Sequence, residues 1–370
     1  MKSLSILFLL SLSLLNVAFA LEPIEHNLDT ALATNNAPAT HEKEKFNAGK
    51  MILHHVVDAH DWHLITLAEG TPHERHISIP LPIIIYSYTK GFSCFSSAHF
   101  TNHETHQPQI YNGYKLKEEH IVAEDDSKII DIIDISITKN VASLLLSILL
   151  LCIVFITVAR AYTKNKGKAP KGLQSFLEPL ILFIRDEVVK PSIGHKADKF
   201  LPFLLTVFFF IFFNNLLGLI PFFPGGANVT GNIAVTMVLA LFTFFITSFS
   251  ASKQYWMHII NTPGVPWWLK FPIPLMPIVE LMGVFSKPLV LMLRLFANIT
   301  AGHIIALAFF SLIFIFGEMS TGLGYGVSVL SVAFTIFMNF LELLVAFLQA
   351  YVFTLLSSIY IGMAVADDHH

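Results

Sequence analysis

The residues best suited to chemistry lie in two long apolar stretches near the C-terminus. Arg294 and His303 occur in the first stretch, and Glu342 and Gln349 in the second. A charged side chain at the centre of a bilayer costs about 2.5–3.5 kcal/mol on insertion scales, so ionisable residues in such stretches are functional candidates by default. Between positions 201 and 363 only seven residues are charged, namely Lys253, Lys270, Glu280, Lys287, Arg294, Glu318 and Glu342.

These side chains differ in what they can do with a proton. The guanidinium of Arg294 stays charged at all physiological pH values, so its action is electrostatic: it can hold a carboxylate ionised or repel a cation. His303 and Glu342 can take up and release protons, whereas Asn298 and Gln349 can form hydrogen bonds without titrating. An arginine in an apolar helix with no carboxylate nearby in its own chain indicates that its counter-ion belongs to another protein.

The spacing places most of these groups on shared helix faces. Glu280, Lys287, Arg294 and Asn298 are separated by seven, seven and four residues, which at 100° per residue returns to nearly one face. His303 falls on the opposite side. Lys287 has a second interpretation as a lysine that extends its ammonium group to the membrane interface, with Glu280 pairing to it or lying in the headgroup zone. Arg294 has no comparable structural interpretation, because more than twenty uncharged residues follow it.

Glu342 and Gln349 are also seven residues apart and therefore share a helix face. Glu342 is the only charged residue between positions 319 and 366. Its isolation strengthens its candidacy as a functional group.

The amino-acid composition of the chain indicates what kind of structure holds these residues. The 370-residue chain is 54% hydrophobic and only 13% charged, about half the charge of an average soluble domain. The charge is uneven, since 12 of the 17 histidines precede Asn140. A net charge of −3 gives no reason to expect nucleic-acid binding. The two cysteines, Cys94 and Cys152, are not expected to form a disulfide, because the second lies in an apolar run.

Three segments are expected. Residues 1–20 are typical of a secretory signal peptide, with Lys2, an apolar region and a small-residue cleavage site at Ala18-Phe-Ala20; an uncleaved anchor helix is the alternative. Residues 21–135 would be an exported accessory domain on the periplasmic side. Residues 136–370 would be the membrane domain.

Charge at the ends of the apolar segments predicts the topology. Residues 141–159 contain no charge and are long enough to span a bilayer. Residues 201–252 read as a hairpin of two spans with an external turn at 221–228. Residues 172–199 suit an amphipathic helix on the cytoplasmic face, or an ordinary loop helix. The first span is followed by basic residues that mark the cytoplasmic side, Arg160, Lys164, Lys166, Lys168 and Lys171.

The last two apolar segments are too long for simple spans. Residues 274–316 would form a helix of about 64 Å, residues 327–364 are nearly as long, and a bilayer core is only about 30 Å thick. These helices must be broken, protrude or tilt. The stretch 317–326, rich in glycine, is expected to be a loop that exposes Glu318.

The exported segment is expected to be a small α/β or β-rich domain, because pieces such as residues 77–86 have strand-like patterns. Four of its histidines are closely spaced, His54, His55, His60 and His63. Histidines at such spacing can bind zinc, but exposed histidines are common and no catalytic template is present. The cluster can equally be a packing or assembly element.

The stretch Ser286–His303 resembles the signature of subunit a of F-type ATP synthases. It contains Arg294-Leu-Phe-Ala-Asn298 followed by Ala301-Gly-His303, a combination that a low-complexity sequence does not produce by chance. The segments 342–353 and 214–221 also resemble that family. The resemblance covers residues 140–366 and implies an all-α integral membrane protein with five or six membrane-associated helices. The exported segment is longer than is usual in the family.

The resemblance implies roles for individual residues. Arg294 matches the stator arginine that faces the carboxylate of the rotating c-ring and prevents ions from short-circuiting between two half-channels. His303 and Glu342 match a pair lining the periplasmic half-channel. Asn298 and Gln349 match supporting polar residues near the arginine, and Glu280 and Lys287 would line or support the channel.

The same resemblance implies the assembly. The last two helices of the family form a long, steeply tilted hairpin against the ring. The partners would be the c-ring proteolipids, the b subunits of the peripheral stalk, the remaining F1Fo subunits and the lipid membrane, with no nucleic acid. The chain would translocate protons for ATP synthesis without being catalytic alone, and would need no cofactor or metal. The chain would lie in the inner membrane of a bacterial cell, with its C-terminus in the cytoplasm.

Two other hypotheses come from other classes. A self-contained secondary transporter or channel would transport ions as a purified chain and would be expected to show an inverted repeat, which the sequence does not display. A membrane-anchored periplasmic metal-binding protein or hydrolase would hold stoichiometric zinc. The sequence does not decide between H+ and Na+, because the ion-binding carboxylate would lie on the partner.

Overall fold

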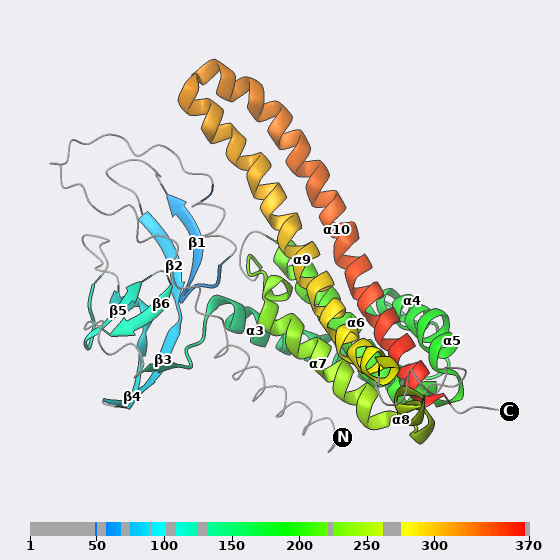
Figure 1. Ribbon diagram of the computed structural model, residues 1–370. Helices are drawn as coiled ribbons and strands as arrows, with labels where there is room; N and C mark the ends of the chain where they lie inside the picture. The colour runs from blue at the N-terminus through cyan, green and yellow to red at the C-terminus, as the bar shows by residue number, and fades with distance from the viewer. Residues whose placement is uncertain are drawn as a thin grey trace. The chain divides into compact units, whose positions relative to one another are not determined.

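The computed structural model describes residues 49, 57–67, 75–88, 90–100, 109–117, 119–123, 132–220, 225–261 and 275–366. The predicted signal peptide lies outside these residues. The described chain divides into two compact units, one holding Ala301–Phe340 and the other holding Asp58–Thr300 together with the chain from Leu341 onward. Within the described residues, five helices are long and apolar enough to cross a membrane, which confirms the expected multi-pass membrane protein (Figure 1).

The described residues between 58 and 134 contain short antiparallel strands, as the sequence predicted for this segment. Strand β3 (Pro82–Ser87) is central in a three-stranded sheet with β4 (Gly91–Ser96) and β7 (Ile132–Asp134). Two hairpins accompany it, β1 (Asp61–Leu67) with β2 (Arg75–Pro80) and β5 (Tyr114–Lys117) with β6 (His120–Ala123). The stretch 77–86 therefore contributes to two strands separated by Leu81. We call residues 58–134 the β module.

One face of the three-stranded sheet forms the core of the β module. Alternate residues of β3, Ile83 and Ile85, are completely buried, as expected for a strand with period two. They pack with Phe100 at the end of the 3₁₀ helix η1 (Ser97–Phe100), and with Tyr114 and Ile121 from the β5–β6 hairpin.

Hydrogen bonds fix the β module to the first membrane helix, α3 (Lys139–Lys164). The Asp58 carboxylate accepts from the hydroxyl of Thr138 at 2.7 Å and from the backbone N–H of Asn140 at 3.0 Å. The backbone N–H of Lys139 donates to the carbonyl of Ala59 at 2.8 Å. An acidic group at a helix N-terminus stabilises it by satisfying unpaired N–H groups and by opposing the helix dipole. The β module and α3 are therefore joined by specific contacts.

A hydrogen bond between buried His60 and partly exposed Asp134 reinforces this junction. The His60 side chain is 6% exposed, and its Nε2 lies 3.2 Å from Oδ2 of Asp134 at the end of β7. Burial disfavours the protonated imidazole, but the hydrogen bond to Asp134 and the charges of Asp134, Glu119 and Asp58 outweigh it and raise the pKa of His60 above 6.5. Partial desolvation would raise the pKa of Asp134, but hydrogen bonds from His60 and Ser136 to its ionised form outweigh it and hold that pKa below 3.8.

The stability of this junction is expected to depend on pH. The raised pKa of His60 gives stability that is present below pH 6.5 and is lost as pH rises through the folded-state value. The lowered pKa of Asp134 gives stability that is present above pH 3.8 and is lost on further acidification. Hydrogen-exchange protection at the backbone amides of Ile135 and Ile137 should therefore be greatest between these limits. His60→Gln should remove the loss of hydrogen-exchange protection at alkaline pH. An unchanged loss of protection in that variant would contradict the role assigned to His60.

The membrane domain continues from α3 through a broken helix and a hairpin. Its elements are α4 (Leu173–Phe183), the π-helical turn η3 (Ile184–Val189), α5 (Lys190–Ile193), η4 (Gly194–Lys196), α6 (Ala197–Leu219), η5 (Val229–Gly231), α7 (Ile233–Ser250) and α8 (Lys253–Ile260). The predicted hairpin of two spans is thus α6 and α7. The stretch 172–199 is helical, as expected, and it runs on into α6.

The two C-terminal segments form uninterrupted helices, α9 (Leu275–Met319) and α10 (Thr321–Val365), of 45 residues each. Only Ser320 separates them, so the prediction of a loop over residues 317–326 was wrong. The glycines serve close packing instead: a Cβ on Gly324 would lie 2.8 Å from the Cα of Gly317. Near this end of the hairpin the rings of Phe309 and Phe334 stack with centroids 5.1 Å apart.

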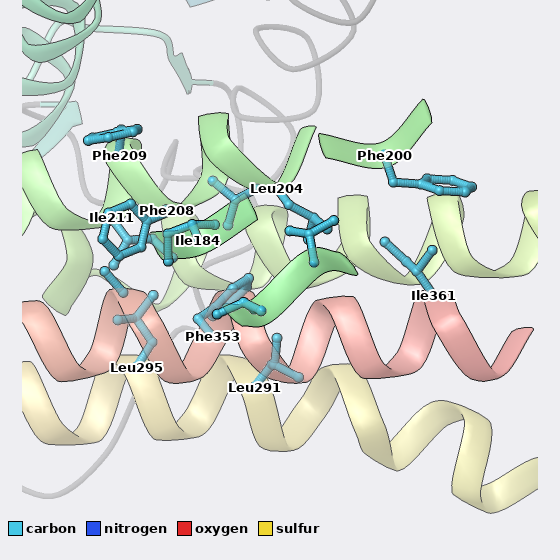
Figure 2. Packing of buried hydrophobic residues seen from close by; sticks show 14 of the residues in the cluster. Ile184, Phe200, Leu204, Phe208, Phe209, Ile211, Leu291, Leu295, Phe353 and Ile361 are labelled. Atoms are coloured by element: carbon cyan, nitrogen blue, oxygen red, sulfur yellow. The ribbon is translucent and has the colours of Figure 1, made fainter. Parts of the chain in front are cut away.

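The apolar core of the membrane domain joins helices that are far apart in sequence. Figure 2 shows Leu291 and Leu295 of α9 and Phe353 of α10 packed beside residues of α6 such as Leu204 and Phe208. All five side chains are at most 3% exposed. This packing fixes which faces of α9 and α10 remain available for other contacts.

Candidate functional site

The two faces of α9 around Arg294 differ sharply. Leu291, Leu295 and Ile299 are 1–4% exposed and belong to the buried core. Arg294 and Asn298 are exposed on another face of the same helix. The core packing therefore directs the guanidinium away from the protein interior, and it places Asn298 one turn further along, as the spacing predicted.

Arg294 has no ion pair in the part of the chain that the structure describes, where the recorded pairs are His60–Asp134, Arg185–Asp186 and Lys190–Asp186. Tyr360 of α10 lies close enough to Arg294 to interact electrostatically with its guanidinium. A charged guanidinium on an apolar helix, with no carboxylate paired to it among the described residues, is the arrangement that predicts a partner carboxylate.

Glu280 and Lys287 lie on α9, toward its N-terminus, and are half-buried. The Lys287 ammonium lies 5.5 Å from the ring centroid of Tyr360, a cation–π contact. Glu280 acts on Tyr255 of α8: burial, and then the charge of Glu280, raises the pKa of Tyr255. The described residues show no Glu280–Lys287 ion pair, so Lys287 pairs with an aromatic ring instead.

Glu342 and Gln349 share the buried face of α10, as their spacing predicted. Each is 6% exposed, whereas Leu343 and Leu344 are exposed on the other side of the helix. A nearly buried carboxyl group in an apolar helix is costly, which makes Glu342 a functional candidate.

His303 lies on α9 and is half-buried. It belongs to the compact unit Ala301–Phe340, whereas Glu342 belongs to the other unit. The pairing of His303 with Glu342 therefore stays a prediction.

A buried hydrogen-bond network leads to the turn of α10 that follows Glu342. The amide Nδ2 of Asn215 donates to the carbonyl of Ala346 at 3.0 Å, and the hydroxyl of Thr230 donates to Oδ1 of Asn215 at 2.6 Å. Ala346 lies one helical turn after Glu342. This network was not predicted from the sequence. Two adjacent asparagines in a run of Phe and Leu could have indicated it.

Further buried polar atoms lie on α3 and α6. The Oδ1 of Asn140, the Oγ of Ser143 and the Oδ1 of Asn214 have no hydrogen-bond partner in the described chain, although these residues are only 1–4% exposed. Helix α3 packs against both α6 and η5. Buried polar atoms in native proteins are normally paired, and water satisfies those that the chain leaves over. The α3–α6–η5 interface is therefore suited to hydration.

The Asn215 network should contribute measurably to stability. Thr230→Val keeps the shape of the side chain but leaves Oδ1 of Asn215 buried without its donor, which costs about 1–3 kcal/mol. We expect a lower thermal unfolding midpoint for purified Thr230→Val than for the wild type. Thr157→Val is the matched control, because that hydroxyl is exposed and bonds only within its own helix. Equal midpoints for the wild type and Thr230→Val would contradict the assignment.

The described residues contain no group of three or more metal-ligating side chains. His54 and His55 lie outside the described residues, and His60 contacts Asp134. The zinc hypothesis for the histidine cluster thus stays a prediction. Both Cys94 and Cys152 are free thiols, as expected.

Comparison with known proteins gives two family matches. The model for the ATP synthase A chain matches residues 141–362, and a domain of unknown function, DUF8433, matches residues 51–140. ATP synthase subunit a of Chloroherpeton thalassium is 44% identical over 244 residues, which are 64% of this chain and 69% of that protein. ATP synthase subunit a 2 of Chlorobium luteolum is 37% identical over 351 residues, 93% of this chain and 83% of that protein.

Proposed function

The chain belongs to the ATP synthase A chain family, the subunit a of F-type ATP synthases, and we propose that Arg294 is its stator arginine and that Glu342 lies in a proton half-channel. Protons would cross the membrane at the interface between this chain and a rotating ring of c subunits. The observation that carries the proposal is the orientation of Arg294, exposed on a helix whose opposite face is buried.

The charge of Arg294 would control where a ring carboxylate releases its proton. An opposite charge within about 4–6 Å favours the ionised carboxylate and lowers its pKa by roughly 1–3 units. A protonated ring carboxylate that reached Arg294 would therefore lose its proton. Because the arginine stays charged, it would also repel cations and separate the two access paths.

The buried polar residues support an access path from the exported side. Asn140 and Ser143 lie in the first two turns of α3, next to the β module. Asn215 joins η5 to α10 at Ala346, one turn from Glu342. We infer that hydrated groups at these positions lead protons to Glu342, with His303 and Gln349 as further members of the path.

The proposed topology places the β module in the periplasm and the C-terminus in the cytoplasm. The end of α3 at Lys164 and the connection that follows it are rich in lysine, which is typical of the cytoplasmic side. The coupling ion would be H+, because a carboxyl and an imidazole group are proposed for the path. The partners would be the c-ring, the b subunits and the remaining F1Fo subunits.

Disulfide cross-linking in the assembled complex tests the interface. In a chain whose native Cys94 and Cys152 are replaced by serine, Asn298→Cys should cross-link to a small two-helix proteolipid carrying a cysteine beside its buried carboxylate. Ile299→Cys is the matched control, since Ile299 is adjacent but only 4% exposed. Equal cross-linking at both positions, failure to co-purify with any proteolipid, or ion transport by the purified chain alone would each overturn the proposal.

A further inference from the structure

The three-stranded sheet of the β module has a second face that no described part of the chain covers. Ile83 and Ile85 point into the module core, so Ile84 and Tyr86 point the opposite way. In β4, Phe92 and Cys94 are exposed on that same side. We call this the outward sheet face.

The strand register gathers apolar side chains on this face. Tyr86 stands opposite Phe92 on one side and opposite Ile133 on the other. These three side chains are 41%, 68% and 40% exposed. Tyr88, 68% exposed, extends the row, with its ring edge-on to Tyr86 at 5.6 Å. Ile84 stands opposite Cys94.

The composition of the outward sheet face is unsuited to water. An antiparallel sheet with one solvated face normally alternates apolar residues inward with polar residues outward. Here the outward positions of the three strands carry no charged side chain: they are Pro82, Ile84, Tyr86, Phe92, Cys94, Ser96 and Ile133. Contiguous exposed apolar surface of this kind marks a contact with another apolar phase or partner.

The membrane begins next to this face. The N–H of Ile135 donates to the carbonyl of Ile84 at 2.9 Å, and the N–H of Ile137 donates to the carbonyl of Pro82 at 3.1 Å. These bonds hold the sheet against the segment that precedes α3, which starts at Lys139. Lys139 follows Ile133 by six residue steps, which span at most about 20 Å at 3.4 Å per residue. The outward sheet face is thus fixed close to the bilayer and continues, through Ile135 at 48% exposure, toward a membrane helix.

We propose that the outward sheet face rests on the lipid bilayer, in the interfacial layer of the leaflet where α3 begins. Tyrosine and phenylalanine are suited to this layer, because an aromatic ring can enter the lipid while the tyrosine hydroxyl stays hydrated. Isoleucines at its edge would bury in the acyl boundary, as on the apolar face of an interfacial helix. The inference concerns the β module alone and does not depend on the roles of Arg294 or Glu342.

The native Cys94 provides the probe. In a Cys152→Ser chain reconstituted in lipid nanodiscs, Cys94 is labelled with an environment-sensitive fluorophore, and a fraction of the lipid carries a nitroxide near the headgroup. Contact with lipid predicts that the nitroxide lowers the fluorescence at least twofold and that aqueous iodide quenches weakly. Lys117→Cys, labelled in a chain without either native cysteine, is the matched control: Lys117 is an exposed residue at the end of β5 in the same module and should show the reverse pattern.

Two further measurements complete the test. Phe92→Glu and Tyr86→Glu alter exposed side chains, so the β module should still fold while lipid quenching of the Cys94 label falls toward the control value. Strong iodide quenching without nitroxide quenching at Cys94 would overturn the proposal. Protection of Cys94 from iodide that appears only when other F1Fo subunits are present would also overturn it, because the face would then bind a protein.

Discussion

Arg294→Ala is expected to abolish proton-driven ATP synthesis by the assembled complex. Two unit charges 4 Å apart at an effective dielectric constant of 20 interact by about 4 kcal/mol, which corresponds to roughly a thousandfold in an equilibrium between protonated and ionised carboxylate. Without the guanidinium, a ring carboxylate would keep its proton as it passed, and the separation of the two access paths would fail. Inverted membrane vesicles should therefore show little synthesis and a raised passive proton conductance.

Two companion variants separate the charge from its geometry. Arg294→Lys keeps a positive charge but lacks the planar, delocalised group and can lose its proton when buried, so it should recover little of the rate. Leu289→Ala removes an exposed side chain of the same helix and should synthesise ATP at nearly the normal rate. Near-normal proton-driven synthesis by Arg294→Ala in a complex of normal composition would refute the proposed role of the arginine.

Glu342→Gln is expected to block proton transfer without opening a leak. The amide keeps the size of the side chain but cannot take up or release a proton, and loss of a positioned acid–base group lowers rates by roughly a hundredfold or more. Because Arg294 is intact, passive proton conductance should stay low. ATP-driven proton pumping and proton-driven synthesis should fall together. Glu342→Asp, which keeps the carboxyl group, should retain part of the rate, and a fully active Glu342→Gln complex would exclude Glu342 from the path.

The same measurement tests the predicted partnership of Glu342 with His303. If the two groups serve one proton path, the double variant Glu342→Gln/His303→Gln should be little slower than Glu342→Gln alone. If they act independently, the two losses should multiply. The comparison requires all three variants in the same membranes, with equal amounts of complex confirmed by immunoblotting.

Much of the fold could be predicted because membrane residence leaves few choices. A run of apolar residues long enough to span lipid must be helical, since only internal hydrogen bonds can satisfy its backbone. The span from residue 141, the hairpin over 201–252 and the two long C-terminal segments were predicted on this ground, and each is helical. That Glu342 and Gln349 share a helix face also followed from their seven-residue spacing, whereas the burial of that face did not.

Other features depend on contacts between residues far apart in sequence. The glycines at 317 and 324 suggested a loop, because isolated glycine weakens a helix, but packing of one helix end against the other keeps both helical. Nothing in the sequence around Asn215 indicated that its side chain would donate to the carbonyl of Ala346. The strand pairing of the β module was likewise unpredictable, because short strands acquire their register only from their neighbours.

The junction between the β module and α3 has a mechanical consequence. Only four residues separate the last residue of β7 from Lys139, and Asp58 and Ala59 bond directly to the residues around the start of the helix. Because the connection is short and hydrogen-bonded, a twist or tilt of α3 must turn the whole β module with it. The β module thereby acts as a lever on α3. A rigidly attached dye on the module would convert small movements of α3 under load into changes in polarised fluorescence.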